Sequence, residues 1–424
     1  GNAAGGRLAD RFPPADLIGP ALLVGGVFTW LAPLWARVLD PTPGAGPVTI
    51  IGLSAVLFFA PAVALSAITP LVAKLQLQSL DESGTVVGNL SAAGTAGALA
   101  GTFVTGFVLV ASFGTRTLFV AVGAVLVAAG LAFTGSTRLR TNPLALVLAA
   151  AIGAGALVVG DRCQAETSYA CADLVVDEGR PTGRSLVLNG DRNSYVDVDD
   201  PLFLDFRYAR LFADVLAEVD SGPLEAVHIG GAGFTVPRYL EARRPGSDQV
   251  VLEIDRELVD FVTDELGSIE GPNLRVVVGD ARLTMAEVPS DSQDVVFGDA
   301  FSGLTVPWHL TTTQFVADID RVLRPGGVVM LNLIDGGDIE FARASLATYA
   351  EHFEHVALIE PPEGVPPTGA WNLIVIASDR PIGDLRIDPA DGRMVPAATV
   401  AGYVAEGLVL DDDFAPVDQI RRAR

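Results

Sequence analysis

Residues 224–255 read LEAVHIGGAGFTVPRYLEARRPGSDQVVLEID, and they predict a strand, a glycine turn, a helix and a second strand. The apolar run 224–229 is typical of a buried parallel strand, and three glycines follow it within four residues. Residues 236–242 continue as a helix with Pro237 in its first turn, where proline is tolerated. Residues 250–254 form the second strand, so the stretch predicts a βαβ unit.

Two features of this unit indicate a nucleoside site. Gly230, Gly231 and Gly233 let the backbone approach a ligand closely. Glu253 lies at the tip of the second strand, about 20 residues further on, where a carboxylate can accept hydrogen bonds from ribose hydroxyls. Asp255 is next to it, and we interpret it as the cap of the following helix.

Strands and helices alternate through the rest of this half. Further strands are expected at 274–278, 294–297 and 328–333, and helices near 257–266, 312–323 and 339–352. This alternation predicts a parallel sheet with helices on both faces. Two later strands, near 355–359 and 372–378, would complete a seven-stranded sheet, and the tail from 379 onward is expected to be acidic and loop-rich.

The segment before this sheet has a different pattern. Residues 172–199 consist of short alternating runs, which predict a small antiparallel β-unit with turns at Gly179, Gly183 and Gly190. Residues 206–219 are amphipathic and predict a helix that leads into the sheet.

Charge and hydropathy divide the 424-residue chain in two. Residues 1–160 hold seven basic and five acidic residues, whereas the remainder has a balance of −25. Five apolar stretches, at 17–38, 48–72, 88–112, 115–134 and 143–160, approach the roughly 20 residues that a bilayer helix requires. The third is rich in small residues, which suits close helix packing in lipid. We therefore predict a multi-pass membrane domain in contact with the lipid bilayer, joined to an acidic half whose charge disfavours nucleic acid.

The side of the membrane that holds the acidic half is left open. If all five stretches span, five basic residues share one side and two the other, which makes the first side cytoplasmic and places the acidic half outside. Cys163 and Cys171 could form a disulfide in such an oxidising compartment. Against this, a nucleoside cofactor is made in the cytoplasm, and the topology inverts if the shortest stretch, 143–160, is re-entrant.

The acidic half resembles the spermidine synthase (polyamine aminopropyltransferase) family over about residues 172–378. The motifs that carry the resemblance are the glycine turn, LEID, VVVGDAR, DVVFGDAFSG and FRYAR. With the helical half, whose GRLADR at residues 6–11 resembles a loop of major facilitator transporters, the chain is similar to fused bacterial proteins. The resemblance implies a β-unit followed by a methyltransferase-like Rossmann sheet. It divides the chain into a transmembrane domain (1–160), a linker with the β-unit (161–205), a Rossmann-like domain (206–385) and an acidic tail (386–424).

The resemblance also implies site residues. Decarboxylated S-adenosylmethionine would be the aminopropyl donor, a polyamine the acceptor, and no metal would be needed. Asp299 is the implied catalytic acid, although a turn-capping role after its strand is the alternative. The implied ligand-binding residues are Gly230, Gly231, Gly233, Glu253, Asp280 and Ala281 for the cofactor, and Asn193, Tyr208 and Ser302 for the substrate.

Three positions depart from the family pattern. Gly233 stands where the family has the aspartate that holds the aminopropyl amine. Ser302 replaces a second aspartate after Asp299, and Ala209 replaces the histidine after Tyr208. The adenosine half of the site is therefore kept, while acids of the amine half are missing.

Other polar residues receive structural interpretations. We expect His228 to be a core histidine, Trp308 and His309 to pack under a loop, and the run from Asp411 to Asp413 to be solvated. His352 and His355 lack further metal ligands nearby, so a solvated helix end is expected there.

Three functions remain in competition. The first is a membrane-anchored aminopropyltransferase-like enzyme, which could form a homodimer through its soluble domain. The second is an S-adenosylmethionine-dependent methyltransferase-like enzyme, favoured by Gly233 because a carboxylate there would repel the methionine carboxylate. The third is a non-catalytic polyamine- or nucleoside-binding domain that regulates the membrane half, favoured by the missing acids.

Overall fold

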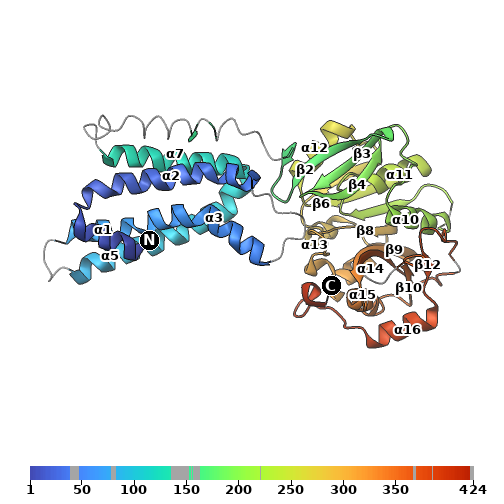
Figure 1. Ribbon diagram of the computed structural model, residues 1–424. Coiled ribbons are helices and arrows are strands. Elements are labelled where there is room, and N and C mark those ends of the chain that lie inside the picture. The colour runs from blue at the N-terminus through green and yellow to red at the C-terminus, as the bar shows by residue number, and fades with distance from the viewer. Residues whose placement is uncertain are drawn as a thin grey trace. The chain divides into compact units, whose positions relative to one another are not determined.

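The computed structural model describes residues 1–38, 47–77, 83–134, 152–153, 155, 163–219, 221–365, 369–383 and 385–420. These residues form two compact units, Gly1–Ser168 and Tyr169–Arg424, which Figure 1 shows as a helical part and a mixed α/β part.

The first unit is helical. Four of its segments are long and apolar enough to cross a membrane, judged by length and composition: Ala15–Ala36, Val48–Gln76, Ser83–Leu109 and Thr115–Thr134. The fifth predicted span, 143–160, lies outside the described residues except at 152, 153 and 155. The GRLADR motif lies on a helix and not in a loop. The helices are α1 (Asn2–Arg11), α2 (Ala15–Val38), α3 (Pro47–Ser66), α4 (Ile68–Gln76), α5 (Ser83–Val104), the π-helical turn η2 (Thr105–Leu109), α6 (Val110–Ser112) and α7 (Thr115–Thr134).

Glycines determine how α2 and α7 pack side by side (Figure 1). A Cβ added at Gly19 would lie 2.9 Å from the carbonyl oxygen of Gly130, and one at Gly26 would lie 2.9 Å from that of Gly123. This is the close approach that small residues permit in lipid. The sequence led us to expect it on the third stretch, but the glycines of α5 have nothing within 4 Å of an added Cβ.

The chain continues with a four-stranded antiparallel sheet in the order β1-β2-β3-β4, of which β2, β3 and β4 belong to the second unit. Its strands are β1 (Ala165–Glu166), β2 (Cys171–Asp177), β3 (Arg180–Leu188) and β4 (Asp191–Asp197). We expected a turn at Gly183, but it lies inside β3, paired with Asp197. Glycine is required there because the phenol of Tyr195 occupies the space that a Cβ would need. Cys163 and Cys171, the two cysteines of the chain, are disulfide-bonded, a state typical of oxidising compartments.

The main sheet has eight strands in the order β12-β10-β11-β9-β8-β5-β6-β7. The five strands from β9 to β7 are parallel, and β10 and β11 are antiparallel. The predicted methyltransferase-like fold is thus confirmed, with one added edge strand of two residues. The strands are β5 (Glu225–Ile229), β6 (Asp248–Glu253), β7 (Leu274–Val278), β8 (Gln293–Gly298), β9 (Leu323–Gly336), β10 (His355–Glu360), β11 (Ala370–Ser378) and β12 (Arg393–Met394).

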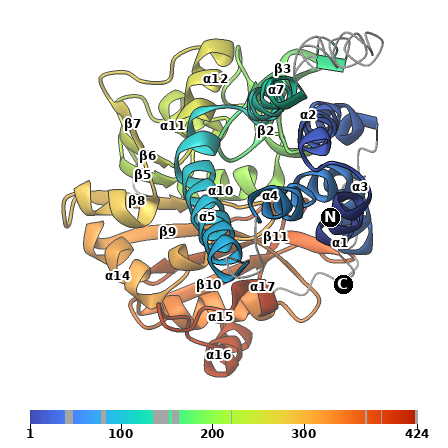
Figure 2. The same cartoon turned by 90° about the vertical axis from the view of Figure 1, so that its left-hand side faces the viewer.

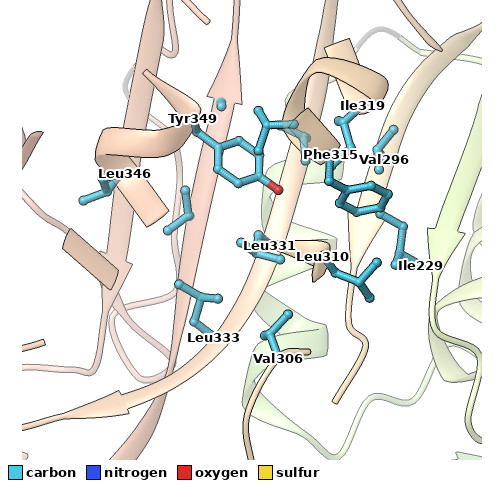
Figure 3. Packing of buried hydrophobic residues seen from close by; sticks show 14 of the residues in the cluster. Ile229, Val296, Val306, Leu310, Phe315, Ile319, Leu331, Leu333, Leu346 and Tyr349 are labelled. Atoms are coloured by element: carbon cyan, nitrogen blue, oxygen red, sulfur yellow. The ribbon is translucent and has the colours of Figure 1, made fainter. Parts of the chain in front are cut away.

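Helices cover both faces of this sheet, because its buried strands present apolar side chains in both directions. On one face, Phe315 and Tyr349 pack among strand residues such as Val296 and Leu331 (Figure 3). On the other face, Phe212 packs on Phe297. The helices are α10 (Arg207–Ala217), α11 (Thr235–Arg243), α12 (Arg256–Leu266), α13 (Ala281–Thr284), α14 (Thr313–Val322) and α15 (Glu340–Tyr349), with 3₁₀ turns at Met285–Glu287 and Trp308–Leu310.

The segment after residue 379, which we expected to be loop-rich, contributes helices to the second unit. These are α16 (Ala397–Glu406) and α17 (Val417–Ile420). α16 lies against α15 in both views (Figures 1 and 2), and its Val400 is 3% exposed within the core. Burial of an apolar side chain explains why this part of an acidic segment is ordered.

Candidate functional site

The site lies where the strand order of the main sheet reverses, between β5 and β8. Ile229 pairs with Gly298, so the two strands end at the same level. The backbone N–H of Asp299 donates to the carbonyl of Ile229 at 2.9 Å. Crevices at the carboxyl ends of strands, at such a reversal, are where open α/β sheets bind ligands.

The glycine loop, residues 230–233, follows β5 directly. Gly230 has φ of +92°, and a Cβ there would lie 2.6 Å from the carbonyl oxygen of Asp299. Both the left-handed backbone and the close approach therefore require glycine. Phe234, which follows the loop, is fully buried, and its ring lies against the position of a Cβ on Gly231.

Glu253 fixes the shape of this loop. Its Oε2 accepts hydrogen bonds from the N–H groups of Gly231 at 2.7 Å and Ala232 at 3.1 Å. Its Oε1 accepts from the N–H of Asp255 at 3.0 Å. Asp255 in turn caps α12, as its sequence position predicted, by accepting from the N–H of Leu258. A buried carboxylate thus already organises the backbone amides that could face a ligand.

Asp280 lies just after β7, the strand next to β6 in the sheet. Its Oδ1 accepts from the N–H of Arg282, which caps α13, and its Oδ2 lies 3.2 Å from Nε2 of His309. Ala281 is buried in the first turn of that helix. We had expected His309 to pack under a loop, but it pairs with an acid at this edge.

The acidic run near the C-terminus is tied to the same region. Asp412 accepts from Arg282 at 2.8 Å and from the hydroxyl of Thr312 at 2.7 Å. Asp411 accepts from the N–H groups of Asp413 and Phe414 and closes a turn. Asp412 and Asp413 are exposed, in keeping with the expectation of a solvated stretch, but the carboxylates of Asp411 and Asp412 also have specific partners.

Asp299 is enclosed among polar side chains just beyond β8. Its Oδ1 accepts from Nδ2 of Asn332 at 2.8 Å, and the hydroxyl of Tyr208 donates to the same carboxylate. Asn332 is held in turn by Asn372 at 3.0 Å. Burial raises the pKa of Asp299 to about 7, against the lowering effect of both donors. Burial and the neighbouring Asp299 also raise the pKa of Tyr208.

A cavity of about 20 Å³ lies between Asp299 and the glycine loop. It is lined by Ser194, Tyr208, His228, Phe297, Asp299 and residues of the loop and of α11. Two predicted substrate residues do not line it. Asn193 lies at the position where the β3–β4 register shifts. Ser302 is exposed in a turn, where its backbone N–H donates to the carbonyl oxygen of Thr305.

Ser194 occupies the place of the missing loop acid. Its Oγ accepts from the N–H of Gly233 at 3.1 Å and lies 2.3 Å from where a Cβ on Gly233 would be. An aspartate at position 233 would therefore collide with β4. Ser194 therefore fills the space in which the side chain of an aspartate at position 233 would lie.

Sequence reasoning missed several residues of the site. Asn332 and Asn372 are polar residues inside apolar strands, VVMLNLID and AWNLIVIAS, which was a readable signal. Tyr169 gave no signal. Tyr169 is largely exposed, and partial desolvation together with Asp255, Asp280, Glu257 and Glu253 raises its pKa, so its phenol lies near the acids of this edge. Among the described residues there is no group of three or more His, Cys, Asp or Glu that could hold a metal ion.

Comparisons with known proteins find relatives in sequence and in fold for part of this chain. A polyamine aminopropyltransferase of Chromobacterium violaceum is 29% identical over 159 residues, which are 36% of this chain and 59% of that protein. One from Vibrio vulnificus is 30% identical over 112 residues, which are 26% of this chain and 38% of that protein. The chain thus spans less than two thirds of these curated relatives. No family model matches it.

The crystal structure of a probable spermidine synthase from Corynebacterium glutamicum is similar at a TM-score of 0.55 and 26% identity. The similarity covers 60% of this chain and 97% of that one. The C-terminal part of the chain is therefore a spermidine synthase-like domain with distant homology to polyamine aminopropyltransferases.

Proposed function

We propose that the protein is a membrane-anchored, spermidine synthase-like transferase that moves an aminopropyl group from decarboxylated S-adenosylmethionine to a polyamine. Glu253 and Asp280 would hold the adenosine part, and Asp299 with Tyr208 would hold the reacting amine. The distant homology supports the reaction class, and the four apolar helices support the membrane anchor.

The chemistry asks for a proton acceptor beside the amine. A C–N bond forms at the methylene carbon as the C–S bond of the sulfonium breaks, and the electron pair of that bond stays on sulfur. The attacking amine has a pKa near ~10, like a lysine side chain, and must lose a proton. A carboxylate within hydrogen-bonding reach can accept that proton and orient the amine.

The observation that carries the proposal is the state of Asp299. It is partly buried at the strand reversal, it is oriented by Tyr208 and Asn332, and desolvation raises its pKa to about 7. A catalytic base works best when its pKa is near the working pH.

One observation favours a second candidate, a methyltransferase-like enzyme that uses S-adenosylmethionine itself. Ser194 fills the space beside Gly233, so no carboxylate at that position would repel the carboxylate of a methionine group. A domain that binds the same ligands without transfer is the third reading.

Binding and turnover by the full-length protein in lipid nanodiscs separate these functions. We expect calorimetry to detect decarboxylated S-adenosylmethionine more strongly than S-adenosylmethionine, and mass spectrometry to detect an aminopropylated amine. Preference for S-adenosylmethionine would favour the methyltransferase. If a ligand binds but no product forms, the non-catalytic binding domain is favoured. If neither donor binds, the nucleoside site itself is contradicted.

The pH dependence of transfer should follow Asp299. Because its carboxyl group must be ionised to accept a proton and its pKa is about 7, we expect kcat/KM to rise as pH increases through about 7. Tyr208→Phe removes a donor that lowers this pKa, so the rise should move to higher pH. Rate profiles from pH 5.5 to 9 check this, and a profile that falls with pH would contradict it.

A further inference from the structure

The segment that follows α16, residues 410–414, is fixed on the second unit by contacts of its own. Leu410 is fully buried, and its N–H donates to the hydroxyl of Thr348 at 3.0 Å. The carbonyl of Leu410 accepts from the N–H of Thr313 at 2.8 Å. None of these contacts uses the side chain of Asp412, so a change of that side chain should leave the segment in place.

Asp412 directs both of its carboxylate oxygens away from its own segment. Oδ2 accepts from Nη2 of Arg282 at 2.8 Å, and Oδ1 accepts from the hydroxyl of Thr312 at 2.7 Å. Nη1 of Arg282 donates to the same hydroxyl at 3.1 Å, so the three side chains form a closed ring of hydrogen bonds. The side chain of Arg282 is only 22% exposed, and this charge-assisted pair should therefore be stronger than an ordinary surface ion pair.

Arg282 links this ring to the carboxylate of Asp280. The backbone N–H of Arg282 donates to Oδ1 of Asp280 at 2.9 Å, and Oδ2 of Asp280 lies 3.2 Å from Nε2 of His309. Nη1 of Arg282 also reaches the carbonyl oxygen of His309, at 3.5 Å. Both of these contacts to Asp280 therefore come from residues that one guanidinium holds. About a third of the Asp280 side chain stays exposed, and its oxygens have further lone pairs with which to accept from a ligand.

We propose that Asp412 is a positioning residue for the nucleoside end of the site, because its pairing with Arg282 fixes the orientation of the Asp280 carboxylate. The inference rests on the proposed function, in which Asp280 holds the adenosine part. Asp412 itself does not touch the ligand. Without it, the guanidinium can turn into solvent, and the order that Asp280 loses must be restored when the ligand binds, at a cost in affinity.

The expected consequence is selectivity for the base. The amino group of adenine donates hydrogen bonds, which a carboxylate accepts. Hypoxanthine has a carbonyl oxygen at the same position and offers the carboxylate no donor there. A fixed Asp280 should therefore favour adenine, and a mobile Asp280 should discriminate less between the two bases.

The test uses the full-length protein in nanodiscs and three probes. These are 5′-methylthioadenosine for the adenosine slot, 5′-methylthioinosine as its counterpart without the amino group, and 1,4-diaminobutane for the amine end. Asp412→Ala removes both acceptors, whereas Asp412→Asn keeps one oxygen and loses the charge. Asp413→Ala is the matched control, because Asp413 is exposed in the same turn. Arg282→Leu, alone and combined with Asp412→Ala, shows whether the effect passes through Arg282.

We expect Asp412→Ala to weaken methylthioadenosine binding about fivefold and to lower its preference over methylthioinosine by a similar factor. Asp412→Asn should recover part of this loss, and Asp413→Ala should match the wild type. The double variant should bind methylthioadenosine no more weakly than Arg282→Leu does, because the two residues act as one pair. Diaminobutane affinity should not change in the variants of Asp412.

Two results would overturn the inference. One is wild-type selectivity between the two nucleosides in Asp412→Ala, and an equal loss for both nucleosides and the diamine counts the same way, since it would indicate general loss of structure. The other is an additive loss in the double variant, which would mean that Asp412 acts without Arg282. Failure of the wild type to bind methylthioadenosine would overturn the proposed function as well.

Discussion

Asp299→Asn is expected to lower the rate of aminopropyl transfer by about 10²–10⁴-fold, the usual contribution of a positioned general base. Asparagine fits the same space and can still accept from Asn332, so the site should keep its shape while losing its proton acceptor. Diaminobutane binding should also weaken, because the ammonium loses its charged partner. The measurement is kcat/KM with a saturating donor, and wild-type turnover by this variant would exclude Asp299 as the base.

The same substitution should stabilise the fold. The folded-state pKa of Asp299, about 7, lies above its ordinary value of 3.8, so the folded protein binds this proton more tightly than the unfolded chain. The wild type therefore loses stability as pH rises from about 4 to about 7. At about 1.4 kcal/mol per pKa unit, the loss is on the order of 4 kcal/mol at most.

Asp299→Asn has no proton to lose, so its apparent melting temperature should exceed that of the wild type at pH 8 and approach it near pH 4. Asn332→Leu serves as the contrast: it removes a donor to the carboxylate and should destabilise most at pH 8. A gain in melting temperature that is the same at both pH values would mean that burial of the charge is not its cause.

The sequence was sufficient for features that depend on local pattern. Strand–helix alternation predicted the parallel sheet, and the glycine loop with Glu253 follows from steric and hydrogen-bonding rules that act within about 20 residues. The capping role of Asp255 is equally local.

Features that depend on register or on distant segments were not readable. The shift in β3–β4 pairing places Ser194, and not Asn193, against the glycine loop. One residue of register exchanges the two faces of a strand, and no single-strand pattern fixes it. The contact between Arg282 and Asp412 joins residues 130 positions apart, so the sequence around either residue does not predict it.

The position of Ser194 also bears on the choice of function. The family resemblance treats Gly233 as the site of a missing acid, whereas the structure has the hydroxyl of Ser194 in that space. Under the proposed function, the amine half of the site would thus consist of uncharged acceptors around one carboxylate. This arrangement can hold an ammonium at lower cost in burying charge than two carboxylates would require.

Substitutions of Glu253 should distinguish its role in stabilising the loop from its role in binding the ligand. Glu253→Ala removes the acceptor of three backbone N–H groups, on Gly231, Ala232 and Asp255. Hydrogen bonds to a charged group contribute about 1.5–3 kcal/mol each, so both a lower melting temperature and a loss of methylthioadenosine affinity of about 100-fold or more are expected.

Glu253→Gln keeps the acceptor of the loop amides and changes the other oxygen. Its amide oxygen can still accept from the N–H groups of Gly231 and Ala232, while its NH₂ group replaces the oxygen that accepts from the N–H of Asp255 and that a ribose hydroxyl would use. We expect the melting temperature to fall less than in Glu253→Ala, but methylthioadenosine affinity to fall about 10–100-fold. Glu265→Gln, which makes the same change on the exposed last turn of α12, should leave that affinity unchanged. If Glu253→Gln binds the nucleoside as tightly as the wild type, Glu253 only shapes the loop, and the ribose must be held elsewhere.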